Sequence, residues 1–275
     1  MSFERIMAEV VGRAITEEQE LSGPWNEYKR TGDRKVLQEA CGYGQKIPDT
    51  RLGAYYYSLV YQKQHYDVLA AVMALQGAAL PHQGRCLMVD FGAGPGTAAL
   101  AWAAHVAGRT GTAPALSYVH LDRLPEMEPL CDALLQADPN TGSGFRGWSY
   151  REVPKDAACP RQWVEDADHA VFVFSYVLCQ ATVGTVVVDE FARLITETCK
   201  ALNGKPAYLL MVDAPLSNSC WPPLLGRLRQ KGMTATPTHP APTLQYRAVY
   251  LNPDGTVRDF RDNAGPAIYD MVQLQ

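Results

Sequence analysis

Three glycines at alternate positions follow an acidic residue in segment 89–97, which reads Val-Asp-Phe-Gly-Ala-Gly-Pro-Gly-Thr. Because glycine has no Cβ, a turn built from it lets the backbone come close to a nucleotide-like ligand. A dinucleotide-binding turn has the spacing G-x-G-x-x-G. Here Gly92, Gly94 and Gly96 have the spacing G-x-G-x-G, with Asp90 two positions before the first of them. The alternative interpretation is a tight turn that binds nothing.

The glycine turn joins a predicted strand to a predicted helix. The apolar run from Cys86 to Val89 indicates a short buried strand, and the Ala-rich segment 98–107 indicates a helix. Strand, glycine turn and helix, with Asp90 in this place, resemble motif I of the class I S-adenosylmethionine (SAM) methyltransferases. The resemblance implies that SAM is the cofactor and that Asp90 helps to orient its amino group. It also implies that the methionine part of SAM is held by Gly92, Ala93, Gly94 and Gly96.

The first 80 residues are expected to be helical. Apolar residues from Phe3 to Ile15 recur at the spacing of one buried helix face. Gly23-Pro24 ends this pattern, and further helices are predicted over 34–40 and, as one long helix or two, over 52–80. We expect residues 1–80 to form a helical cap and residues 81–275 to form the SAM-binding domain.

The remainder of the chain alternates strands and helices. Strands are predicted at 85–91, 116–121, 145–153, 170–177 and 207–212, with helices at 95–107, 125–136, 159–166, 186–202 and 222–230. This alternation indicates a parallel sheet with right-handed crossovers. Segments 233–238 and 246–251 are expected to pair as an antiparallel hairpin at the sheet edge, and 267–272 to add a strand or to pack. The predicted fold class is therefore α/β, with the Rossmann-like sheet of the class I methyltransferases.

Ligands of such sheets lie beyond the carboxyl ends of the strands, so the residue at each strand end is a candidate for the site. The second strand ends at Asp122, whose carboxylate can accept both ribose hydroxyls of an adenosine. More residues separate Asp122 from Gly92 in the sequence than is usual in the family, and a loop insertion at 108–114 would account for the additional residues. The alternative role for Asp122 is a helix N-cap. On the third strand, Trp148 and Ser149 are candidates for adenine contact, or else part of the core.

The fourth strand ends at Ser175 and Tyr176, where this fold is expected to place the SAM sulfonium. Many members of the family carry Asn-Pro-Pro-Tyr or an acid there, and this chain has neither. Tyr176 is the main catalytic candidate, because its ring can lie against a cation, a contact worth ~0.5–2 kcal/mol. Ser175 is the other polar group at this strand end. The alternative for Tyr176 is packing under the sheet edge.

A tyrosine-rich segment lies in the long predicted helix. Tyr57, Tyr61 and His65 recur at i, i+4 and i+8, which indicates one helix face. We expect this face to cover the SAM cleft, with the two tyrosines against the cofactor. His65 is the single histidine of this helix and hence the candidate general base. The alternative is an amphipathic helix with tyrosine hydroxyls at its rim and a surface histidine.

Composition narrows the function classes. The formal net charge of −4 argues against a large nucleic-acid surface, since phosphate binding uses clustered Lys and Arg. The seven cysteines form no C-x-x-C pair, and residues 1–15 do not resemble a secretory signal, so we expect reduced thiols in a cytoplasmic protein. No apolar run approaches the ~18 residues of a membrane span, and no residue spacing indicates a metal site.

Three functions are compatible with these features. The first is a SAM-dependent enzyme of small-molecule biosynthesis that transfers a methyl group and releases S-adenosylhomocysteine. The second is cyclisation of SAM itself to azetidine-2-carboxylate, with release of methylthioadenosine. The third is a non-enzymatic ribosome assembly or RNA-binding factor. The chain also resembles the ribosome-associated methyltransferase-like family called Rsm22, in the segment from Arg51-Leu52 through the long helix, in the Gly92 motif and in segments 174–178 and 210–215. The metal-binding Cys cluster that this family usually carries has no counterpart here.

Overall fold

One large mixed sheet forms the centre of the computed structural model. The structure describes residues 2–17, 23–44, 46–156, 158–178, 183–214, 219–237, 243–246, 249–252, 254, 256–259 and 265–275. In these residues the sheet has eight strands in the order β3-β2-β1-β4-β5-β10-β6, and β7 pairs with another part of β10. The parallel strands are β1 (Arg85–Phe91), β2 (Ala115–Leu121), β3 (Arg146–Tyr150), β4 (His169–Ser175) and β5 (Ala207–Asp213).

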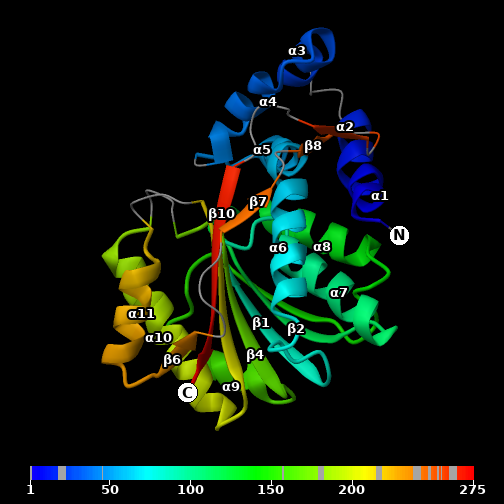
Figure 1. Cartoon of the computed structure of the whole chain (residues 1–275). Helices are drawn as coiled ribbons and strands as arrows, with labels where there is room; N and C mark the ends of the chain where they lie inside the picture. Colours follow the sequence, from blue (N-terminus) through cyan, green and yellow to red (C-terminus); the bar gives the residue numbers. More distant parts are fainter. Residues whose placement is uncertain are drawn as a thin grey trace.

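Helices cover both faces of this sheet (Figure 1). One face packs against α6 (Lys63–Leu75), α7 (Thr97–Thr110) and α8 (Met127–Ala137). The other packs against α9 (Ala158–Val164), α10 (Thr185–Leu202) and α11 (Trp221–Gln230). The central strands are apolar on both sides because both faces are covered. The predicted α/β fold class and the order of these strands and helices are therefore confirmed, although β3 ends at Tyr150 and is shorter than the predicted 145–153.

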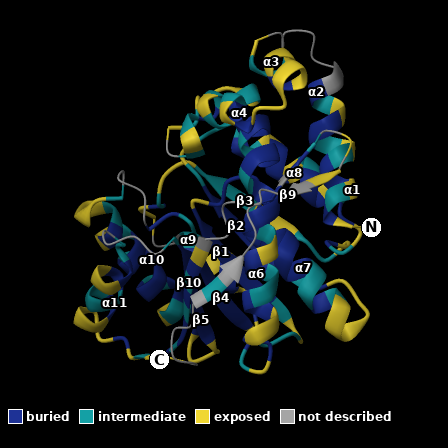
Figure 2. Ribbon diagram, turned by 45° about the horizontal axis from the view of Figure 1, so that its top comes forward, coloured by how far each residue is buried: buried dark blue, intermediate teal, exposed yellow. Residues whose placement is uncertain are grey.

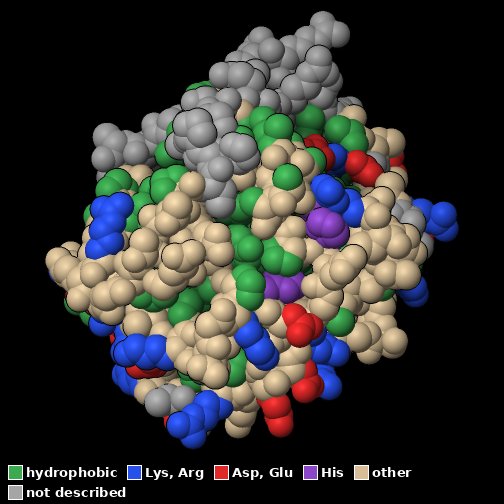
Figure 3. Space-filling model, turned by 60° about the horizontal axis from the view of Figure 1, so that its bottom comes forward, with side chains coloured by type: hydrophobic (Ala, Val, Ile, Leu, Met, Phe, Trp, Pro, Cys, Tyr) green, Lys and Arg blue, Asp and Glu red, His purple; other side chains and the backbone are tan. Residues whose placement is uncertain are grey.

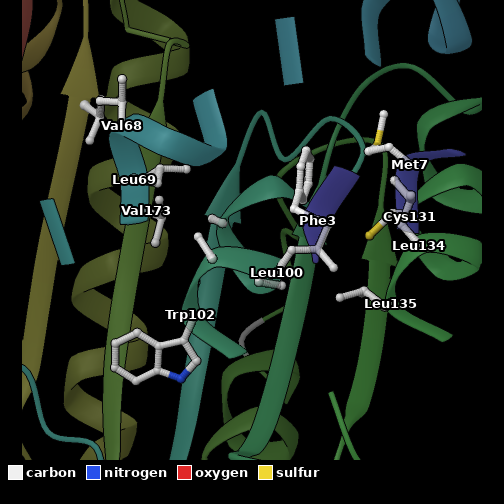
Figure 4. Close-up of a cluster of buried hydrophobic side chains, with 14 of the residues drawn as sticks. Phe3, Met7, Val68, Leu69, Leu100, Trp102, Cys131, Leu134, Leu135 and Val173 are labelled. Atoms are coloured by element: carbon white, nitrogen blue, oxygen red, sulfur yellow. The ribbon is translucent and has the colours of Figure 1, made fainter. Parts of the chain in front are cut away.

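The two faces use alternate residues of each strand, as the pleat requires. Met88 points to the α6–α8 side, whereas Leu87 and Val89 point to the α9–α11 side. Figure 4 shows part of the core on the α6–α8 side, where Leu100 of α7 lies near Phe3 of the N-terminal helix, and Met7 lies near Cys131 and Leu134 of α8. The residues of β1, β2, β4 and β5 are almost all buried, which Figure 2 marks in dark blue, whereas β3 at the edge is intermediate or exposed.

The N-terminal segments are helical, as predicted, but two of them contain π turns. The first helix consists of α1 (Phe3–Met7), the π turn η1 (Ala8–Gly12) and α2 (Arg13–Glu17). The shorter helices α3 (Pro24–Thr31) and α4 (Arg34–Ala40) follow, with a 3₁₀ turn η2 (Gly42–Gly44). The predicted long helix consists of α5 (Arg51–Tyr57), the π turn η3 (Ser58–Gln62) and α6. A π turn holds one more residue than an α-helical turn, so it changes the direction in which the side chains after it point relative to those before it.

The antiparallel edge of the sheet is built differently from the predicted hairpin. β6 (Ala235–Pro237) and β7 (Thr243–Tyr246) both pair with β10 (Gly265–Leu274), which also pairs with β5 along Ala207–Asp213. β8 (Val249–Leu251) instead pairs with β9 (Val257–Asp259) in a second small sheet. The predicted pairing of 233–238 with 246–251 is therefore wrong. β10 takes the place beside β5 because it is long enough to bury Tyr269 and Met271 against the core.

The small β8–β9 sheet connects the end of the chain to the N-terminal helices. The Tyr28 hydroxyl of α3 donates a 2.8 Å hydrogen bond to the Asn252 side chain. Leu251 is buried in the same core as residues of α5 and α6. Among the described residues, no helix is both long and apolar enough to cross a membrane.

Candidate functional site

A cavity of about 450 Å³ lies where the parallel strands end. The glycine turn after β1 and the segments after β2, β3 and β4 contribute to its lining, as do α5 and α10. Gly92, Gly94, Asp122, Ser175, Tyr176 and Tyr57 are among the lining residues. Six residues predicted from widely separated segments therefore meet at one cavity.

All three glycines of the turn have left-handed backbone angles, with φ of 65° at Gly92, 53° at Gly94 and 76° at Gly96. A Cβ on Gly92 would lie 2.5 Å from the Val177 side chain, and one on Gly96 would lie 2.5 Å from Cys131 Sγ. A Cβ on Gly94 would meet only the Tyr57 ring, at 3.8 Å. Packing therefore excludes side chains at Gly92 and Gly96, whereas Gly94 presents bare backbone to the cavity.

Two side chains from the end of β2 hold this turn. Asp122 Oδ2 accepts a 2.7 Å hydrogen bond from the Gly94 N–H, and its Oδ1 accepts one from the Leu124 N–H at 2.9 Å. His120 Nε2 lies 2.7 Å from the Gly94 carbonyl oxygen and donates to it, since a carbonyl can only accept. Asp122 is not a helix N-cap, because α8 begins at Met127. His120 was not among the predicted site residues, although a polar residue near the otherwise apolar end of this strand could have pointed to it.

Asp90 lies behind the turn and is not part of the cavity lining. It is buried, and its Oδ2 accepts a 2.8 Å hydrogen bond from the Tyr118 hydroxyl. Its Oδ1 has no hydrogen-bond partner among the described residues. Burial raises the pKa of Asp90 to about 7, opposed by the Tyr118 hydrogen bond and reinforced by the charge of Asp122. An unsatisfied buried carboxyl oxygen beside a glycine turn is suited to receive a donor from a ligand.

Four aromatic side chains form a cluster at the end of the cavity near α5. The His65 ring stacks on the Tyr176 ring, with centroids 3.9 Å apart and planes 13° apart. Tyr57 lines the cavity and places its hydroxyl 3.3 Å from His65 Nδ1. Tyr61 lies beside both, with ring centroids 5.5 Å from Tyr57 and 6.1 Å from His65. The predicted face of Tyr57, Tyr61 and His65 does lie together, and Tyr176 joins it from the sheet.

His65 does not have the surroundings of a general base. It is 8% exposed, so the alternative of a surface histidine is wrong, and it is not among the cavity-lining residues. Burial lowers the pKa of His65 to about 3, which keeps the ring uncharged at neutral pH. Tyr61 also stays out of the lining, and the Arg34 guanidinium lies 5.7 Å from its ring.

The lining after β3 corrects the predicted adenine contacts. Trp148 and Ser149 do not line the cavity, and Trp148 packs against the core on the α9–α11 side. The strand ends at Tyr150, and the cavity is lined by the following residues Arg151, Glu152, Val153 and Lys155. Trp148 and Ser149 lie within the strand, whereas the cavity is reached by the loop that follows it, and the strand is shorter than the predicted 145–153.

Two further lining or supporting residues were not predicted. Glu190 of α10 contributes a carboxylate to the lining. Gln62, the last residue of η3, is buried and donates a 3.2 Å hydrogen bond from Nε2 to the Pro95 carbonyl. This bond ties the π turn to the glycine turn. Within the described parts of the chain, no group of three or more His, Cys, Asp or Glu side chains is arranged to bind a metal ion.

Charged side chains on one face of the molecule are mixed in sign. Figure 3 shows Lys and Arg side chains scattered over that face, with Asp and Glu between them. They do not gather there into one basic patch of the kind that binds nucleic acid.

The strand order defines the class of fold. Five parallel strands in the order β3-β2-β1-β4-β5, followed by an antiparallel strand inserted between β5 and β6, form the sheet of the class I SAM-dependent methyltransferases. The glycine turn lies after β1, at the point where the strand order reverses, as in other doubly wound sheets that bind nucleotides. The chain therefore has the class I methyltransferase fold.

No protein-family model and no curated protein sequence matches this chain. Among solved structures, a SAM-dependent methyltransferase from Leishmania major is similar, with 14% identity over 92% of this chain and 91% of that one and a TM-score of 0.46. An O-methyltransferase family protein from Burkholderia thailandensis has 13% identity over 91% of this chain and 68% of that one, with a TM-score of 0.47. These likenesses are remote.

Proposed function

We propose that this protein is a SAM-dependent enzyme that transfers the methyl group of SAM to a small molecule and releases S-adenosylhomocysteine. The observation that carries the proposal is the left-handed glycine turn, which presents bare backbone at Gly94 to the cavity and is held by Asp122. A bulky side chain at Gly94 would enter the space where a ligand must approach.

The residues around the cavity suit the parts of SAM. The turn at Gly92, Ala93, Gly94 and Gly96 would hold the methionine part. The orphan Oδ1 of Asp90 offers an acceptor for the amino group. Asp122 would accept the ribose hydroxyls with lone pairs that the Gly94 and Leu124 amides leave unused. In place of Trp148 and Ser149, the residues after β3, such as Glu152 and Val153, would contact the adenine.

SAM supplies a methyl group already activated on a sulfonium, so the protein mainly aligns the reactants and excludes water. Tyr57 of α5 and Tyr176, which follows β4, both line the cavity, and their rings can stabilise the positive charge of the sulfonium. Ser175 lies beside Tyr176 and can orient an acceptor. An acceptor that must lose a proton would find carboxylates in the described lining, from Asp122, Glu152 and Glu190, and no histidine.

Product analysis tests this proposal directly. The purified protein is incubated with SAM, with and without a small-molecule extract, and the adenosine-containing products are separated by mass. Formation of S-adenosylhomocysteine that requires the extract supports methyl transfer. If no extract yields S-adenosylhomocysteine, although the wild-type protein binds SAM in calorimetry, methyl transfer to a small molecule is wrong.

A second candidate, cyclisation of SAM itself, is favoured by Tyr57 and Tyr176, whose uncharged aromatic rings line one end of the cavity. In this reaction the amine nitrogen of SAM forms a bond to its own γ-carbon. The bond from that carbon to sulfur breaks, and its electron pair stays on sulfur in methylthioadenosine. The ring nitrogen then gives up a proton to water. Azetidine-2-carboxylate formed from SAM alone would establish this reaction, and its absence would exclude it.

The described cysteines suit a reducing compartment. Cys41, Cys86, Cys131, Cys159, Cys199 and Cys220 are all free thiols. Persistent free thiols are typical of cytosolic proteins, so we place the enzyme in the cytoplasm. Localisation by a fluorescent fusion would test this assignment, and accumulation outside the cytoplasm would contradict it.

A further inference from the structure

His65 lies behind the cavity end and contacts three tyrosines that come from two distant segments. Its ring stacks on Tyr176 at 3.9 Å, and its Nδ1 lies 3.3 Å from the Tyr57 hydroxyl. Tyr61 lies 6.1 Å away with its plane 22° from that of His65. Of these rings, Tyr57 and Tyr176 line the cavity and His65 does not. His65 therefore contacts the cavity lining through Tyr57 and Tyr176.

The π turn η3 accounts for this arrangement. In a regular α-helix, residues eight apart are rotated by about 80° around the axis. Because η3 (Ser58–Gln62) holds one more residue in its turn, it brings His65 closer to the face that carries Tyr57. Arg34 donates a 2.9 Å hydrogen bond to the Val60 carbonyl within the turn, and Gln62 bonds Pro95 in the glycine turn. These two hydrogen bonds hold the π turn to α4 and to the glycine turn.

Tyr176 needs such support because its backbone is left-handed, with φ of 58°. Bulky residues rarely adopt this conformation, and it persists only where the surroundings hold it. The Tyr176 N–H donates a 2.8 Å hydrogen bond to the Val212 carbonyl, which holds the backbone. The stack on His65 holds the ring, so the direction of the ring at the cavity depends on His65.

Resting on the proposed function, we propose that His65 is a positioning residue, whose uncharged ring holds Tyr176 by stacking and Tyr57 by a hydrogen bond so that both face the SAM sulfonium. Burial keeps the pKa of His65 at about 3. Burial and the nearby charge of Asp122 raise the pKa of Tyr57 well above its ordinary value, and Cys41, Tyr61 and Asp90 add to this. The Tyr57 hydroxyl therefore stays protonated and forms its hydrogen bond with the uncharged ring at Nδ1. His65 itself therefore adds no positive charge behind the cation that the site must stabilise, and Arg34, which lies over the Tyr61 ring, stays the nearby cation of this cluster.

Three variants test the proposal in the full chain. His65→Ala removes the stack, His65→Phe keeps a stacking ring but loses the hydrogen bond, and His105→Phe is a matched control on α7 outside the cavity lining. We expect SAM affinity to change little in all three. We expect turnover of SAM to fall about 10- to 100-fold in His65→Ala, because misplaced groups cost this much, and to recover largely in His65→Phe.

The proposal is overturned if His65→Ala keeps wild-type turnover, or if His65→Phe is as slow as His65→Ala. It is also overturned if wild-type activity follows the titration of a histidine near pH 6.5, as a general base would require. Imidazole NMR signals give a readout that needs no SAM. The ring protons of His65 should be shifted by the Tyr176 ring, and Tyr176→Ala should abolish that shift. Calorimetry of the wild-type protein with SAM separately tests the proposed function.

Discussion

The Asp122 carboxylate accepts a 2.7 Å hydrogen bond from the backbone N–H of Gly94, and so joins the end of β2 to the glycine turn after β1. The same carboxylate accepts from the Leu124 N–H at 2.9 Å. Asp122 thereby fixes the conformation of the turn and also offers its remaining lone pairs to the cavity. These two roles make the Gly94–Asp122 pair the most direct test of the site.

Replacing Gly94 with valine should abolish SAM binding while the fold survives. The new side chain would sit on a left-handed backbone and enter the cavity toward Tyr57, where no core side chain is displaced. Binding is measured by isothermal titration calorimetry and folding by circular dichroism. Gly108→Ala is the control, because a Cβ at this α7 position meets nothing within 4 Å. Unchanged affinity in Gly94→Val would contradict the assignment of the turn.

Asp122→Asn should weaken SAM binding by about 1.5–3 kcal/mol, as expected for loss of a hydrogen bond to a charged group. This corresponds to an increase in Kd of roughly 10- to 100-fold. Calorimetry at fixed pH measures the change, with Asp49→Asn as a control at an exposed carboxylate outside the cavity lining. If Asp122→Asn and Asp49→Asn bind SAM equally well, the role of Asp122 is limited to holding the glycine turn.

Tyr176 variants should separate chemistry from binding. Tyr176→Ala removes the ring that lines the cavity, so turnover should fall strongly and SAM affinity only mildly. Tyr176→Phe keeps the ring and its stack on His65 but loses the hydroxyl. Activity retained in Phe but not in Ala assigns the role to the ring face, and loss in both assigns it to the hydroxyl. Full turnover in the Ala variant would show that Tyr176 is structural.

The buried Asp90 should make stability fall as pH rises. Its pKa is raised from 3.8 to about 7 by burial, so the folded state holds a proton that the unfolded chain has released between these values. Its contribution is therefore fully present below pH 4 and is lost as pH rises through 7, by up to about 4 kcal/mol.

Asp90→Asn removes the titrating carboxyl group, and the side-chain oxygen of the asparagine can still accept the hydrogen bond from the Tyr118 hydroxyl. Denaturant unfolding at pH 5 and pH 8 should show the variant gaining stability relative to wild type at the higher pH. An identical difference at both pH values would mean that Asp90 is ionised throughout.

Local patterns in the sequence were enough for the glycine turn and for the strands and helices on which the fold class rests. Gly92, Gly94, Gly96 and Asp90 lie within one short segment, and the turn conformation depends mainly on the absence of Cβ atoms there. Strand and helix periodicities are likewise local, so the parallel βαβ order could be predicted. Asp122 was predicted from its place at a strand end, because parallel strands bring such ends to one edge.

Only the tertiary structure decided which residues touch across the chain. The contact of His65 with Tyr176 joins α6 to the end of β4, and a one-residue change of register in η3 helps to align it. The loop after β3 lines the cavity, and Trp148 and Ser149 within the strand do not. β10 pairs with β5, whereas proximity in sequence suggested that segments 233–238 and 246–251 would pair as a hairpin at this edge of the sheet. Helix register, strand length and strand pairing depend on distant packing partners, and local sequence patterns do not contain that information.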